Sequence, residues 1–107
     1  MPATPNATIL PIGEMINYQE GSIVSRVILK SEAGNVTLFA FDMGQELSEH
    51  RAPYDALVHV LDGQVEVRIS GKPYLLKSGE AIIMPANEPH ALKAVSKFMM
   101  LLTMIKA

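Results

Sequence analysis

The chain has 107 residues, a formal net charge of −2, 49% hydrophobic residues and 19% charged residues. These values describe one globular domain with enough apolar residues for a core, and they exclude a basic surface for nucleic acid or anionic lipid. The chain has no cysteine, which excludes disulfides and thiolate chemistry and suits a reducing compartment, so we expect a cytoplasmic protein.

The two ends of the chain differ in what they can bury. Residues 1–6 contain two prolines and are expected to form a flexible tail, followed by a single domain over residues 7–107. The start lacks the charged region and the long apolar stretch of a secretory signal. Residues 98–105 are apolar but too short to cross a membrane, so we expect a buried strand there and no membrane contact.

Short segments with a period of two indicate β-strands through the rest of the chain. They are rich in Val, Ile, Leu and Phe and are bounded by Gly, Asp, Asn or Ser. In the last of them Val65 and Val67 alternate with polar residues, which is typical of an antiparallel strand with one face in water. No window predicts a helix. The predicted strands are residues 22–29, 35–41, 56–61 and 64–69.

Three turns separate these strands. Asp62-Gly63 predicts a two-residue hairpin of type I′, because both central residues of that turn need a positive φ. Residues 70–73 and 77–80 predict two more turns. Turns at this spacing between short strands predict an all-β sandwich or barrel.

Two segments carry the signature of a known family. Residues 44–63 (GQELSEHRAPYDALVHVLDG) fit the pattern G-x5-H-x-H-x3-E-x6-G, except that Ala52 and Ala56 stand at the second histidine and the glutamate. Residues 79–94 (GEAIIMPANEPHALKA) fit G-x5-P-x-G-x2-H-x3-N, except that Asn87 replaces the glycine and Ala94 the asparagine. Together the two segments resemble the paired motifs of the cupin superfamily.

The resemblance implies a cupin jelly-roll β-barrel (a double-stranded β-helix) of the small, single-domain RmlC-like type. It also implies a homodimer, with residues 7–12 as the strand exchanged with the partner. The metal ligands that the family's motifs supply are reduced here to His50 and His90. Two imidazoles are fewer than the three protein ligands of catalytic zinc and of two-histidine-one-carboxylate iron sites.

A third metal ligand could come from a neighbouring residue. Asp55 could reach the site through a bulge, although strand parity sends it to the face opposite Ala56, where it would serve in a turn or surface pair. His59 and Glu49 also have the wrong parity and are expected on an outer face. The metal, if bound, would be a divalent transition ion: iron, manganese, nickel, copper or zinc.

Aromatic residues and methionines should line the barrel and make the cavity mostly apolar. Tyr54 and Met84 are therefore further candidates for ligand binding, although ordinary core packing explains the methionines as well. The other residues expected near the cavity are Phe41, Phe98, Met99, Met100 and Met104.

The leading interpretation is a small-molecule-binding cupin with a reduced polar site, acting as a sensor or accessory protein. The alternative is a metal-dependent oxygenase or isomerase that uses His50, His90 and a third ligand. A third reading is metal-free acid–base catalysis by either histidine, whose unperturbed pKa is about 6.5.

Overall fold

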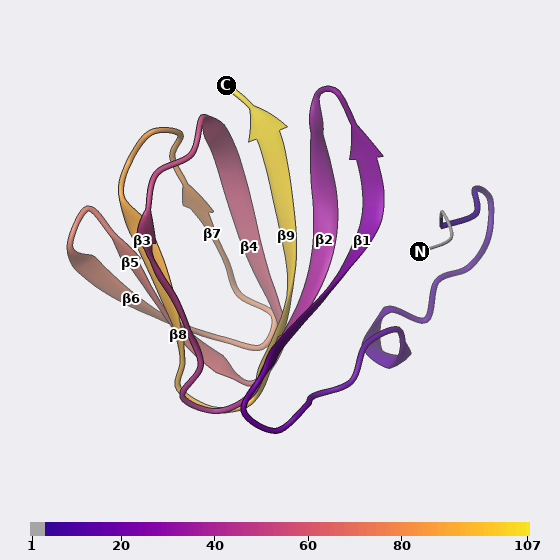
Figure 1. Ribbon diagram of the computed structural model, residues 1–107, viewed down its shortest axis with the longest axis horizontal. Coiled ribbons are helices and arrows are strands. Elements are labelled where there is room, and N and C mark those ends of the chain that lie inside the picture. Colours follow the sequence, from indigo (N-terminus) through magenta and orange to yellow (C-terminus); the bar gives the residue numbers. More distant parts are fainter. Residues whose placement is uncertain (1–3) are drawn as a thin grey trace.

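The computed structural model describes residues 4–107, and the regular secondary structure of these residues is almost entirely β-strand (Figure 1). The described residues contain no α-helix and one short 3-10 helix, η1 (Ile12–Glu14). The strands are β1 (Ile23–Ser31), β2 (Gly34–Phe41), β3 (Glu46–His50), β4 (Tyr54–Asp62), β5 (Gln64–Ile69), β6 (Lys72–Lys77), β7 (Ala81–Met84), β8 (His90–Ala94) and β9 (Phe98–Lys106).

The strands form two antiparallel sheets that face each other in Figure 1. The five-stranded sheet has the order β1-β2-β9-β4-β7, and the four-stranded sheet has the order β3-β8-β5-β6. The predicted all-β jelly roll is therefore confirmed. The four predicted strands correspond to β1, β2, β4 and β5, and the apolar C-terminal run to β9.

The main core fills the space between the sheets. Phe41 and Phe98 stack with ring centroids 4.5 Å apart, next to valines that are fully buried. Val65 and Val67 face this core from β5 while Gln64 and Arg68 are exposed, as the alternation predicts. Burying large aromatic and branched side chains from both layers is what holds the two sheets together.

A second apolar cluster covers the outer face of the five-stranded sheet. Leu38, Ala40 and Met99 alternate with residues of the main core, so they point to the opposite side. Ile16, from the segment after η1, packs on them. Tyr18 anchors the same segment, because its hydroxyl donates a hydrogen bond of 2.6 Å to a carboxylate oxygen of Asp62.

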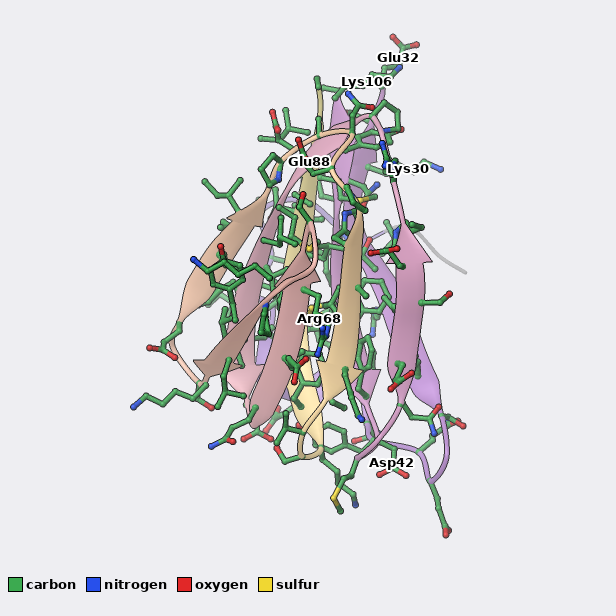
Figure 2. All side chains as sticks on the ribbon, turned by 90° about the vertical axis from the view of Figure 1, so that its left-hand side faces the viewer. Lys30, Glu32, Asp42, Arg68, Glu88 and Lys106 are labelled. Carbon is green, nitrogen blue, oxygen red and sulfur yellow. The ribbon has the colours of Figure 1, made fainter. Side chains whose placement is uncertain are left out.

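The outer face of the four-stranded sheet is polar. Arg68 lies on this side of the molecule (Figure 2) and pairs with Glu66 at 2.8 Å. Lys93 of β8 lies 3.6 Å from Glu46 of β3. The two sheets thus differ in what covers their outer faces.

The Asp62-Gly63 turn is not a hairpin, and that prediction is wrong. Gly63 has φ of 77°, but Asp62 does not adopt a positive φ, and β4 and β5 belong to different sheets. Glycine is needed at 63 because a Cβ there would meet the backbone oxygen of Lys97 at 1.9 Å. The hairpin with two positive φ values is Ser70-Gly71 (50° and 82°), which joins the paired strands β5 and β6.

The N-terminal segment does not form a strand within this chain. Of the predicted tail, residues 1–3 lie outside the described part and residues 4–6 are irregular; residues 7–11 are also irregular, and Ile12 begins η1. Exchange of residues 7–12 with a second copy stays a prediction, and the 95% exposure of Ile9 leaves that side chain available for it. Within residues 4–107, no helix has the length and apolarity needed to span a membrane.

Candidate functional site

A β-bulge in β3 aims His50 into the barrel. Leu47 stands opposite Leu92 of β8, whereas His50 stands opposite His90. Two residues of β3, Ser48 and Glu49, therefore face a single residue of β8. The extra residue reverses the strand's alternation, so Leu47 and His50 can both contact the interior although they are three positions apart.

The turn before β8 aims His90. Asn87 adopts the left-handed conformation with φ of 66°, as expected for a residue at the glycine position of the motif. Its amide donates a 2.8 Å hydrogen bond to the carbonyl of Ala52. Glu88 accepts a 2.6 Å hydrogen bond from the hydroxyl of Ser70. These contacts tie the turn to the neighbouring chain segments and fix the start of β8.

The two imidazoles meet inside the barrel. Their Nε2 atoms are 3.0 Å apart, and the rings are edge-to-face with centroids 4.3 Å apart. Each Nδ1 faces a carbonyl oxygen, that of Ser48 at 2.9 Å from His50 and that of Glu88 at 3.3 Å from His90. A carbonyl oxygen can only accept, so this assignment places the ring hydrogen on each Nδ1.

The pair therefore needs something between its Nε2 atoms. When both rings are neutral in this tautomer, each Nε2 presents a lone pair to the other. Two lone pairs at 3.0 Å repel unless a shared proton, a hydrogen-bond donor or a cation lies between them. The arrangement is thus suited to receiving a donor group or a positive charge.

The two histidines differ in their access to water. His50 is exposed, whereas only 6% of the surface of His90 is accessible. Burial is the largest cause that lowers the pKa of His90, and the nearby charge of His50 lowers it further. The carbonyl of Glu88 acts in the opposite direction. The net effect lowers the pKa of His90 and disfavours its charged form.

A small apolar cavity lies against the histidines. Its volume is about 50 Å³, and Tyr54 and Met84 line it, while their role in ligand binding stays a prediction. Ala52 and Ala56 also face it, so both motif alanines share one space with His50 and His90. The remaining lining residues are Leu47, Leu92, Met100, Leu102 and Met104.

The residues considered as a third ligand lie elsewhere. Asp55 does not line the cavity, and its carboxylate accepts a 2.9 Å hydrogen bond from the amide of Ala86. His59 is exposed on β4, on the face opposite Ala56 and Val58. Glu49 is exposed within the bulge of β3. None of the three shares the space between the two imidazoles.

The residues present do not fit the divalent ion that the family's motifs would hold. Within residues 4–107 there is no group of three or more His, Cys, Asp or Glu side chains able to surround an ion. Only two of the motif's four ligands are present, and methyl groups replace the others. We therefore derive no chemical step through such an ion.

Some lining residues were not expected from the sequence, and some expected ones lie elsewhere. Leu92 follows His90 by two residues on β8, and that spacing could have identified it. Leu47 could not be found in this way, because the bulge changes the parity between it and His50. Phe41, Phe98 and Met99 were expected near the cavity but do not line it: the two rings pack against each other in the core, and Met99 lies in the second cluster on the outer face.

Comparisons with known proteins agree with this architecture. The sequence profile of the Cupin domain family matches residues 37–106. A protein named polyketide synthase CurC, from Streptomyces cyaneus, is 25% identical over 75 residues. That match covers 69% of this chain and 49% of the relative, so the chain spans about half of the relative's length.

Two solved structures are more similar in sequence. A conserved SPY1581 protein of unknown function from Streptococcus pyogenes is 34% identical, with a TM-score of 0.90. That match covers 100% of this chain and 96% of the other. A Cupin 2 conserved barrel domain protein from Leptotrichia buccalis is 42% identical with a TM-score of 0.85, over 88% of this chain and 46% of the other.

Proposed function

Because the chain belongs to the cupin superfamily, we propose that it binds a small ligand inside its barrel through His50 and His90, as a sensor or accessory protein. The observation that carries the proposal is the 3.0 Å approach of the two Nε2 atoms beside an apolar cavity. Fold alone selects no activity, so the proposal depends on this site.

The lining of the cavity defines the class of ligand. The two Nε2 atoms accept hydrogen bonds, and most of the other lining side chains are apolar. A volume of about 50 Å³ holds roughly three to five groups of the size of a water molecule. The ligand is therefore a small molecule with a short apolar body and one proton-donating group, such as a short-chain carboxylic acid or alcohol.

The accessibility of His50 supports entry from solvent. His50 is exposed while His90 is buried, so the polar end of the cavity is the end nearer to water. A short-chain carboxylate that enters there can accept a hydrogen bond from the imidazole pair when the pair carries a proton taken up from solvent. Burial and the nearby charge of His50 lower the pKa of His90, so the charged form of that ring is disfavoured.

The enzyme alternative has less support from the residues. A metal-dependent oxygenase or isomerase needs a third ligand, and Asp55 is engaged with the amide of Ala86. No serine, threonine, lysine or carboxylate is among the described residues that line the cavity, so the site offers no activated nucleophile there. These features favour binding over catalysis.

Binding can be tested by titrating the protein with butyric acid at pH 6 and following the imidazole nitrogen signals by NMR. We expect saturable shifts of the His50 and His90 signals, with a dissociation constant between about 10 µM and 10 mM for a ligand of so few atoms. Butane-1-sulfonate, whose headgroup is larger, should bind more weakly.

The matched variants are His90→Asn at the site and His59→Asn on the outer face. His90→Asn should lower the affinity for butyric acid at least tenfold, and His59→Asn should leave that affinity unchanged. A titration that moves neither imidazole signal in the native protein would contradict the proposal. So would equal affinity in the native protein and the folded His90→Asn variant.

A further inference from the structure

We propose that the same cavity is a site for a soft monovalent cation, Cu(I), held by Nε2 of His50, Nε2 of His90 and thioether sulfurs of the lining methionines. This inference names a second ligand for the site of the proposed function and rests on that site being open to ligands. It differs from the divalent site of the family's motifs, whose ligands are half missing here.

The nitrogen donors are already oriented for a cation. Both Nδ1 atoms face carbonyl oxygens, so both Nε2 lone pairs point into the 3.0 Å gap between the rings. Fixing the outer nitrogen in this way is how proteins usually set the tautomer of a metal-binding histidine. The pair thus supplies two pre-oriented neutral imidazole ligands.

The sulfur donors come from the facing sheet. Met84 of β7 and Met104 of β9 both stand opposite Ala56 of β4, one on each side. Met100 lies four residues before Met104 on the same face of β9, and all three methionines line the cavity with the histidines. Thioether sulfur is a soft ligand that favours Cu(I) over hard or borderline divalent ions.

The surroundings of the site favour an ion of low charge and low coordination number. Neither a carboxylate nor a charged amine is among the described residues that line the cavity. Desolvating an ion in an apolar space becomes more costly with the square of its charge, so a monovalent ion is preferred to a divalent one. A space of about 50 Å³ also leaves little room for the water shell that Mg²⁺ retains.

Binding of Cu(I) requires the two Nε2 atoms to lie slightly farther apart than they do in the structure. With a metal–nitrogen distance of about 2.05 Å, the observed 3.0 Å separation corresponds to an angle at the metal of about 95°. A three-coordinate site needs about 120°, which the same bond length places at a separation of about 3.5 Å. Because His50 lies at the accessible end of the cavity, an outward displacement of its ring by about 0.5 Å would give that separation.

The test is an anaerobic titration of the native protein with Cu(I) against a chelator, bathocuproine disulfonate, followed by X-ray absorption of the loaded protein. We expect one equivalent of Cu(I) with both nitrogen and sulfur neighbours. Zn²⁺, titrated separately, should bind at least about 100-fold more weakly because it lacks a third nitrogen or oxygen ligand here.

Paired variants identify the sulfur donors. Met84→Leu with Met104→Leu removes two thioethers at nearly constant volume, whereas Met43→Leu with Met99→Leu removes two that lie outside the cavity. The variant that removes Met84 and Met104 should lower the affinity for Cu(I) about 10–100-fold and remove sulfur neighbours from the X-ray absorption spectrum. The second pair should change neither. If the first variant does not fold, the X-ray absorption spectrum of the native protein decides.

Failure of this inference is separable from failure of the proposed function. Absence of Cu(I) binding by the native protein, or Cu(I) with nitrogen neighbours only, would overturn the sulfur–nitrogen site. Butyric acid binding would still stand by its own titration. Because both ligands use the same Nε2 atoms, Cu(I) loading should also abolish the shifts caused by butyric acid, and simultaneous binding would overturn the shared site.

Discussion

The two sheets of the barrel share one core but differ in their outer faces. The outer side of the five-stranded sheet carries an apolar cluster at β2 and β9, on which the segment containing Ile16 packs, while β4 leaves His59 exposed on the same side. The four-stranded sheet carries charged residues outside, among them Arg68 and Lys93. The outer face of one sheet is thus partly covered by an apolar segment of the chain itself, while the outer face of the other sheet carries charged residues.

This difference extends into the site. The polar groups of the cavity, His50 and His90, come from β3 and β8 of the four-stranded sheet. The facing wall comes from β4, β7 and β9 of the five-stranded sheet and offers methyl groups and thioethers. A ligand in the cavity therefore meets hydrogen-bonding groups on one side and soft, apolar ones on the other.

The largest expected effect is loss of the core that joins the two sheets. Phe41→Ala removes a fully buried ring that stacks on Phe98, and should lower the free energy of unfolding by about 3–5 kcal/mol. Leu75→Ala, on the outer face of β6, should change it by less than about 0.5 kcal/mol. Urea unfolding followed by circular dichroism measures both, and similar losses would contradict this description of the core.

The next prediction converts the apolar wall into a polar one. Ala52 and Ala56 line the same cavity as the histidines, so Ala52→His with Ala56→Glu places four metal ligands around one space. The double variant should bind Zn²⁺ or Ni²⁺ at least about 100-fold more tightly than the native protein, which corresponds to about 2.7 kcal/mol. The new side chains should lower stability by about 1–3 kcal/mol through overpacking.

Calorimetric titration of the folded double variant measures this gain, with circular dichroism as the check on folding. Ala91→His is a suitable control, because Ala91 lies on β8 between His90 and Leu92 and points away from the cavity. Affinity no greater than that of the native protein would show that the two alanines do not face the histidines.

The third prediction concerns the cover of the five-stranded sheet. Ile16 is buried against Leu38 and Met99, so Ile16→Ala should lower the free energy of unfolding by about 2 kcal/mol. Ile9→Ala should have no measurable effect on the monomer, because that side chain is almost fully exposed. If Ile9→Ala is destabilising only at high protein concentration, residues 7–12 are engaged with a second copy.

Much of the fold follows from local sequence pattern. Alternation located β1, β2, β4 and β5, because burial on one face imposes a period of two on every such strand. The pairing of strands did not follow. Asp62-Gly63 has the composition of a hairpin, yet Gly63 serves to let the chain pass close to the backbone of Lys97 on its way to the other sheet. That requirement is long-range and leaves no local signal.

The site divides in the same way. Motif spacing brought His50 and His90 together, and the structure places their Nε2 atoms 3.0 Å apart, although their role as ligands stays a prediction. The bulge at Ser48 and Glu49 could not be predicted, because it arises from the pairing of β3 with β8. The soft wall of methionines was also ambiguous in the sequence, since methionine is equally common in ordinary cores.

The smallest expected effect is a pH dependence of the free energy of unfolding, caused by the buried imidazole of His90. Burial lowers the pKa of His90 in the folded protein, so the unfolded chain binds a proton near pH 6.5 that folded His90 does not. The free energy of unfolding should therefore fall as the pH decreases below about 7, by at most about 1.4 kcal/mol per pH unit from this group, and level off below the folded pKa.

Urea unfolding of the native protein and of His90→Asn at several pH values between 7 and 4.5 isolates the contribution, because carboxylate titrations are common to both. The variant should show the smaller slope, while His59→Asn, altered on the exposed outer face, should keep the native one. A steeper fall in His90→Asn than in the native protein would mean that His90 gains a proton on folding, and the facing lone pairs would then be bridged by that proton in the ligand-free barrel.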